Sequence, residues 1–117
     1  MSNDRIYQEI LEERYRQIEK WGEQHHRHSE GVDSVSEYEF WSDMAERYRN
    51  LNDVKHTDSW DDILMEEIAE AFSEPDLAKR RAELIQCAAV IFAEIEDIDM
   101  PGQPFLSETF SQNLPPT

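Results

Sequence analysis

The sequence contains a single cysteine, Cys87, and few of the patterns that build strands or membrane spans. One thiol excludes an intrachain disulfide and a zinc site made of several thiolates. Its place in "IQCAAVIF" predicts a small buried hydrophobe rather than a nucleophile. No stretch approaches the roughly eighteen consecutive apolar residues of a membrane helix, and the first residues lack an apolar signal core. These absences predict a soluble, cytoplasmic protein with little strand.

Positive charge is scarce. The 117 residues include 27 acidic and 11 basic side chains, for a formal net charge of −16. Such a charge opposes contact with nucleic-acid phosphates or anionic lipid, so we expect neither partner. The acidity serves either solubility or a group of carboxylates that awaits a divalent cation. A hydrophobic content of 38% gives a lone monomer only a small core, which favours oligomerisation.

Apolar residues recur at three- and four-residue steps in four segments, which predicts an all-α protein. The expected helices run from about Asn3 to Gly22, Ser36 to Leu51, Trp60 to Phe72 and Pro75 to Ile98. Pro75 suits the first turn of the last helix, and Thr57, Asp58 or Ser59 can cap the third. We predict one four-helix, bundle-like domain over residues 1–100 and an irregular tail over 101–117. Candidates to dock from that tail on a neighbour are Phe105, Leu106 and Phe110.

Carboxylates flank the apolar faces of the two last helices. Glu67 and Glu70 are neighbours on the third helix, and Glu83 and Gln86 share a flank of the fourth. The faces expected to pack are Leu64, Ile68 and Ala71 on the third helix, and Leu84, Ala88, Ile91 and Ile95 on the fourth. A short connection makes the two helices antiparallel neighbours, so the flanks can meet. Crowded carboxylates raise one another's pKa, and Mg²⁺ or Mn²⁺ relieves that repulsion. Spacing alone leaves open a cation site and a solvated acidic face.

Two short motifs carry a resemblance to a known family. "EEIAE" at Glu66–Glu70, followed by "ELIQ" at Glu83–Gln86, resembles the EExxE…ExxD signature of the all-α nucleoside triphosphate pyrophosphohydrolases, the MazG-like and dimeric dUTPase superfamily. "EKWGEQHH" at Glu19–His26 resembles the end of the family's first helix, where aromatic and polar side chains line the base pocket. The resemblance covers the first, third and fourth expected helices.

The resemblance implies a Mg²⁺-dependent enzyme, with Mn²⁺ as the alternative ion, that forms a homodimer or homotetramer. Its substrate would be a nucleoside or deoxynucleoside triphosphate, cleaved to the monophosphate and diphosphate to control the nucleotide pool. Glu67, Glu70 and Glu83 match the family's metal ligands, and Glu67 and Glu70 are the candidate catalytic carboxylates. Candidate substrate-binding residues are Lys20, Trp21, Gln24, His25, Trp60 and Arg81.

The departure from the family pattern is Gln86, which stands where the signature has Asp. An amide oxygen still ligates a cation, but it adds no charge and cannot act as a base. Glu66 and Glu94 are the candidate outer or substitute ligands. The alternative interpretation is a catalytically silent nucleotide-binding or adaptor protein of the same fold.

Simpler roles remain open for the other candidates. Trp21 and Trp60 can anchor helix junctions instead of stacking on a base, and Arg81 can pair with nearby acids in solvent. The run "HHRH" at His25–His28 is better explained by surface histidines than by zinc, because adjacent loop histidines rarely converge on one ion. The segment 27–59 is a candidate lid or subunit interface.

Overall fold

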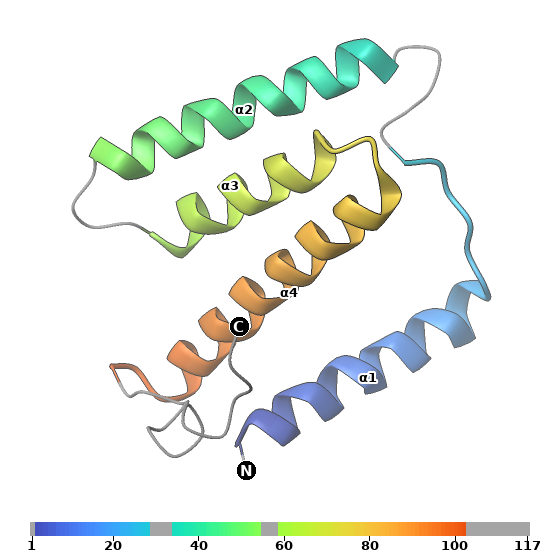
Figure 1. Ribbon diagram of the computed structural model, residues 1–117. Helices are drawn as coiled ribbons and strands as arrows, with labels where there is room; N and C mark the ends of the chain where they lie inside the picture. Colours follow the sequence, from blue (N-terminus) through green and yellow to red (C-terminus); the bar gives the residue numbers. More distant parts are fainter. Residues whose placement is uncertain (1, 29–33, 55–58, 103–117) are drawn as a thin grey trace. The chain divides into compact units, whose positions relative to one another are not determined.

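Figure 1 shows the computed structural model of the chain, which describes residues 2–28, 34–54 and 59–102. All regular secondary structure in these residues is helical, so the all-α prediction is confirmed. The helices are α1 (Ser2–Trp21), α2 (Ser34–Val54), α3 (Trp60–Phe72) and α4 (Leu77–Asp99). None of these described helices combines the length and apolar character that a bilayer span requires. Thr57, Asp58, Phe105, Leu106 and Phe110 lie outside the described residues.

Local hydrogen bonds set the C-terminal end of α1 and the N-terminal start of α3. Gly22 has a φ of +71° and donates its backbone N–H to the Ile18 carbonyl at 2.7 Å, which closes α1 with a left-handed residue. The Ser59 hydroxyl accepts from the Asp62 backbone N–H at 3.1 Å and so caps α3. Ser59 is thus the N-cap among the three residues predicted for that role.

The start of α4 differs from its prediction. The Asp76 carboxylate accepts from the backbone N–H groups of Ala78 at 2.9 Å and Lys79 at 3.2 Å. This places the N-cap at Asp76 and the first helical residue at Leu77, so the placement of Pro75 in the first turn was wrong. A side-chain cap satisfies two orphan donors, whereas a proline in the first turn only avoids adding one.

The chain divides into two compact units. One contains α1 up to Gly22 and the chain from Ala93 onward, and the other runs from Glu23 to Phe92. The last turns of α4 therefore belong to the first unit, and the rest of α4 belongs to the second with α2 and α3. The single-domain organisation of residues 1–100 stays a prediction.

In the second unit, three helices meet around Phe72 at the end of α3. The Trp41 ring of α2 contacts the Phe72 ring edge-on, with 4.9 Å between centroids. The Arg80 guanidinium of α4 lies 5.0 Å from the same ring centroid. Small buried side chains, Ala45 on α2 and Ala69 on α3, line the core of this unit and let the helices approach closely.

The buried side of α4 in this unit is not the one that periodicity indicates. Arg80 and Cys87 are buried, whereas Leu84 is 42% exposed and Ile91 is 43% exposed. Ala88, which lies between them, is exposed as well, so the face predicted to pack was wrong for these three residues. Apolar spacing shows that α4 is amphipathic, but the neighbouring helices decide which side they cover. The burial predicted for Cys87 is confirmed.

The first unit is built on Ile6 of α1, which is almost fully buried. Ile6 and Ile10 of α1 and Ile95 at the end of α4 line one cavity in this unit. Glu96 is also buried in this unit, and burial raises the pKa of its carboxyl group.

Candidate metal centre

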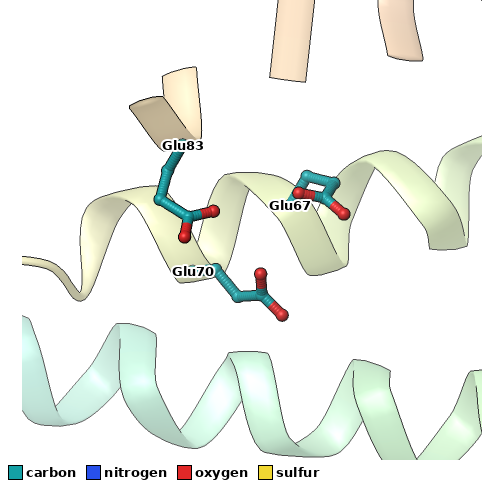
Figure 2. Close-up of side chains that lie close together, drawn as sticks. All are labelled: Glu67, Glu70 and Glu83. Carbon is teal, nitrogen blue, oxygen red and sulfur yellow. The ribbon is translucent and has the colours of Figure 1, made fainter. Parts of the chain in front are cut away.

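Helices α3 and α4 bring three carboxylates together. Glu67, Glu70 and Glu83 each offer a carboxylate oxygen, and these oxygens all lie within 4.8 Å of one another. Figure 2 shows Glu83 extending from α4 toward α3, while the Glu70 carboxylate lies on the side of α3 that faces α2. We call these three side chains the carboxylate cluster. The structure thus brings together three of the four side chains that were expected to meet across the two helices.

Burial and mutual repulsion disfavour the ionised forms of Glu67 and Glu70 in the carboxylate cluster. Burial, followed by the charges of Glu83 and Glu66, raises the pKa of Glu67. Burial also raises the pKa of Glu70, and the charges of Glu67 and Glu83 add to that effect. Each additional negative charge in a partly desolvated space makes the next one harder to hold.

Two oxygen atoms of the cluster lack partners. The Oε2 atoms of Glu67 and Glu83 are buried and make no hydrogen bond with any described residue. Buried polar atoms in folded proteins nearly always have a partner, so an orphaned carboxylate oxygen needs an explanation. Oxygen ligands from several carboxylates are the set that Mg²⁺ and Mn²⁺ prefer. The residues present therefore fit a hard divalent cation.

Helix α2 adds two polar residues that the sequence patterns did not single out. The Arg49 Nε lies 3.8 Å from Oε1 of Glu70, and the charge of Arg49 lowers the pKa of that carboxyl group against the effects that raise it. The Asn52 amide donates to Oε1 of Glu66 at 2.7 Å. Arg49 and Asn52 are three residues apart, so both lie on one side of α2. The spacing shows that they share a side of α2, but not that this side faces α3, so the sequence carried no signal for their contacts with Glu66 and Glu70.

Glu66 and Glu94, the candidates for an outer or substitute ligand, differ in their positions. Glu66 is held by Asn52, and its charge raises the pKa of both Glu67 and Glu70, so it lies near the carboxylate cluster without joining it. Glu94 belongs to the other compact unit and is not part of the cluster. The roles of both residues stay predictions.

Position 86 contributes an exposed side chain. Gln86 is exposed on α4, whereas the next residue, Cys87, is buried. Burial raises the pKa of the Cys87 thiol, and the negative charges of Glu67 and Glu83 raise it further. The buried side of α4 therefore carries Glu83 and Cys87, one helical turn apart. The role of Gln86 as a ligand stays a prediction.

The candidate substrate-binding residues fall in different parts of the chain. In the first unit, the Lys20 ammonium lies 4.7 Å from the centroid of the exposed Trp21 ring. In the second unit, His25 Nε2 lies 3.4 Å from Oε1 of Glu23, and both side chains face solvent. The other three are Gln24, exposed in the same loop, Trp60, half-buried at the start of α3, and Arg81, exposed on α4. Their roles in substrate binding stay predictions.

No family model, curated protein or solved structure matches this chain. The chemistry of the site therefore rests on its own side chains. They provide a concentrated negative charge, two buried oxygen atoms in need of a partner and one nearby guanidinium. Such a site can hold a divalent cation and, through it, an anionic ligand.

Proposed function

We propose that the protein is a Mg²⁺-dependent hydrolase of nucleoside or deoxynucleoside triphosphates that releases the monophosphate and diphosphate. The observation that carries this proposal is the convergence of Glu67, Glu70 and Glu83, the positions that match the acidic signature, within 4.8 Å. Mn²⁺ would fit the same oxygen ligands. A chain with a net charge of −16 repels a triphosphate unless a cation stands between them.

In this proposal the carboxylate cluster holds the cation and also accepts a proton from the attacking water. When bound, a divalent cation neutralises phosphate oxygens and acidifies a nearby water. An oxygen of Glu67 or Glu70 that does not hold the cation accepts the proton of the attacking water. Water attacks the α phosphorus. The bond between this phosphorus and the oxygen that bridges the α and β phosphates breaks, and diphosphate leaves.

Gln86 supports a second candidate, a catalytically silent protein that binds nucleotide or a partner through the same fold. Its amide is neutral where the family signature has an acid, and its side chain is exposed. Under this alternative, the carboxylate cluster would bind a cation and nucleotide without turnover.

Assembly into a homodimer or homotetramer is part of the proposal. Exposed large apolar side chains, such as Tyr7 (57% exposed), Ile10 (41%) and Ile85 (56%), give the chain apolar surface that an interface can cover. Sedimentation equilibrium would test this. A single monomeric species across the accessible concentration range would refute it. We further infer that the protein acts in the cytoplasm, where nucleoside triphosphates are abundant.

The decisive test is a panel assay with product identification. Purified protein with Mg²⁺ or Mn²⁺ is expected to convert at least one nucleoside triphosphate to its monophosphate and diphosphate. Glu67→Gln should abolish turnover and keep the helical circular dichroism signal. Absence of diphosphate from a full panel, together with binding of a non-hydrolysable analogue, would favour the silent alternative. Unchanged turnover in Glu67→Gln would remove this residue from the site.

A further inference from the structure

The Arg49 side chain of α2 lies beside the carboxylate cluster, in contact with Glu70. Its Nε lies 3.8 Å from Oε1 of Glu70, and its side chain is 48% exposed. Among the described groups that shift the pKa of Glu67 or Glu70, Arg49 supplies the only positive charge. This guanidinium therefore acts on Glu70, one of the three carboxylates of the cluster.

The ion pair between Arg49 and Glu70 is weak by its geometry. It consists of a single long contact through Nε, in which both side chains keep access to water. Exposed pairs of this kind contribute little, because water screens the charges and holding two long side chains costs entropy. The two terminal nitrogens of Arg49 make no hydrogen bond or ion pair with any described residue. Most of the donor capacity of the guanidinium is thus available to another ligand.

A cation on the cluster changes what Arg49 contacts. Glu70 then shares its negative charge with the cation, and the cation and the guanidinium repel each other. The Glu70 carboxylate lies on the side of α3 that faces α2 (Figure 2), and Arg49 Nε is 3.8 Å from it. A phosphate group on a cation held by Glu70 would therefore come close to the guanidinium. A planar guanidinium fork matches two phosphate oxygens, and charge-assisted hydrogen bonds of this type are among the stronger ones.

We propose that Arg49 is a phosphate-binding residue of this site, paired with Glu70 in the free protein and with a substrate phosphate once a cation is bound. This inference rests on the proposed function, because it takes the carboxylate cluster as the cation site. It deepens that function by assigning α2 a direct role in substrate binding. Under this assignment, one side of the phosphate chain contacts the cation and the other contacts the guanidinium.

The test uses the full-length chain and inorganic pyrophosphate, the phosphate-chain product, as the probe. Calorimetry first measures Mn²⁺ binding alone, and then pyrophosphate binding at saturating Mg²⁺. Arg49→Ala should bind Mn²⁺ at least as tightly as the wild type, since the competing guanidinium is gone. Its affinity for pyrophosphate should fall about tenfold, the loss expected for one charge-assisted hydrogen bond.

Arg47→Ala is the matched control. Arg47 lies two positions earlier on α2, about 200° away around the helix, and is also exposed. The substitution removes the same charge from the same element, so general electrostatic attraction changes equally in both variants. Arg47→Ala should leave pyrophosphate affinity within about twofold of the wild type.

Arg49→Lys decides the outcome if Arg49→Ala loses its helical circular dichroism signal. Lysine keeps the charge and the pairing with Glu70 but lacks the planar fork, so pyrophosphate should bind about threefold more weakly while Mn²⁺ affinity is unchanged. The inference is overturned if Mn²⁺ binds normally and the folded Arg49 variants bind pyrophosphate as Arg47→Ala does; the proposed function then survives. If the wild type binds no Mn²⁺, the proposed function fails, and the inference fails with it.

Discussion

The ionised form of Glu67 is destabilised both by burial and by neighbouring negative charges. Burial and the nearby charges of Glu83 and Glu66 all disfavour its ionised form, and its buried Oε2 has no hydrogen-bond partner among the described residues. A residue with these properties weakens the fold unless something compensates. A bound cation would offset the repulsion at Glu67. The effect of Glu67 on stability should therefore depend on both the pH and the presence of the cation.

The sign of this pH dependence follows from the raised pKa. Between the unfolded value, near 4.5, and the higher folded value, the folded protein binds more protons than the unfolded chain. The stability contribution of Glu67 therefore decreases as pH rises through this window, and it is lost once the pH lies above the folded pKa. Glutamine has nearly the shape of protonated glutamate and carries no charge at any of these pH values.

Glu67→Gln should raise the melting temperature at pH 7 in a chelator, by about 3 °C, because it removes a partly screened repulsion. The gain should vanish near pH 4, where wild-type Glu67 is protonated, and Mg²⁺ should stabilise the wild type but not the variant. Thermal melts followed by circular dichroism measure all three effects. Glu46→Gln, at an exposed site on α2, is the control. A less stable Glu67→Gln variant at pH 7 would contradict this account.

The individual residues differ in how far the sequence predicted them. The convergence of Glu67, Glu70 and Glu83 followed from a three-residue step on one helix and a short link to the next. Arg49 was missed because its contribution depends on how α2 packs on α3, which no spacing within α2 determines. Chemistry within one helix is local in the sequence, whereas a contact between helices is not.

At the scale of the elements, α3 shows how strongly a local cap fixes a helix. Its predicted bounds, Trp60–Phe72, are those of the structure, and the Ser59 hydroxyl supplies the cap at its start. The start of α4 was mispredicted because two start signals compete there. Pro75 suits a first turn, but the Asp76 carboxylate accepts two backbone hydrogen bonds and fixes the first helical residue at Leu77.

Substitutions at these two positions should separate the signals. Asp76→Ala is expected to destabilise the protein by about 1 kcal/mol, because it leaves two backbone donors at the start of α4 without their acceptor. Pro75→Ala should change stability by less than about 0.5 kcal/mol, since Pro75 precedes the cap. Urea unfolding followed by circular dichroism gives both values. A larger loss for Pro75→Ala than for Asp76→Ala would place the helix start at the proline after all.

For the molecule as a whole, the net charge of −16 is the property that most limits which ligands can bind. Such a protein repels nucleotides in general, so any specific hold on a triphosphate requires a local reversal of sign. The carboxylate cluster is the place where a cation can provide that reversal. The helical class of the protein could be predicted from apolar periodicity, but the buried side of α4 could not. Both possible sides carry apolar residues, and the contacts with α3, such as that of Arg80 with the Phe72 ring, lie on only one of them.

The most direct measurement is a titration with Mn²⁺, in which electron paramagnetic resonance detects the free ion. We expect saturable binding by the wild type, at least tenfold weaker binding by Glu83→Gln, and unchanged binding by Glu46→Gln. Equal Mn²⁺ binding by all three proteins, or no saturable binding by the wild type, would show that the three carboxylates do not hold a divalent cation.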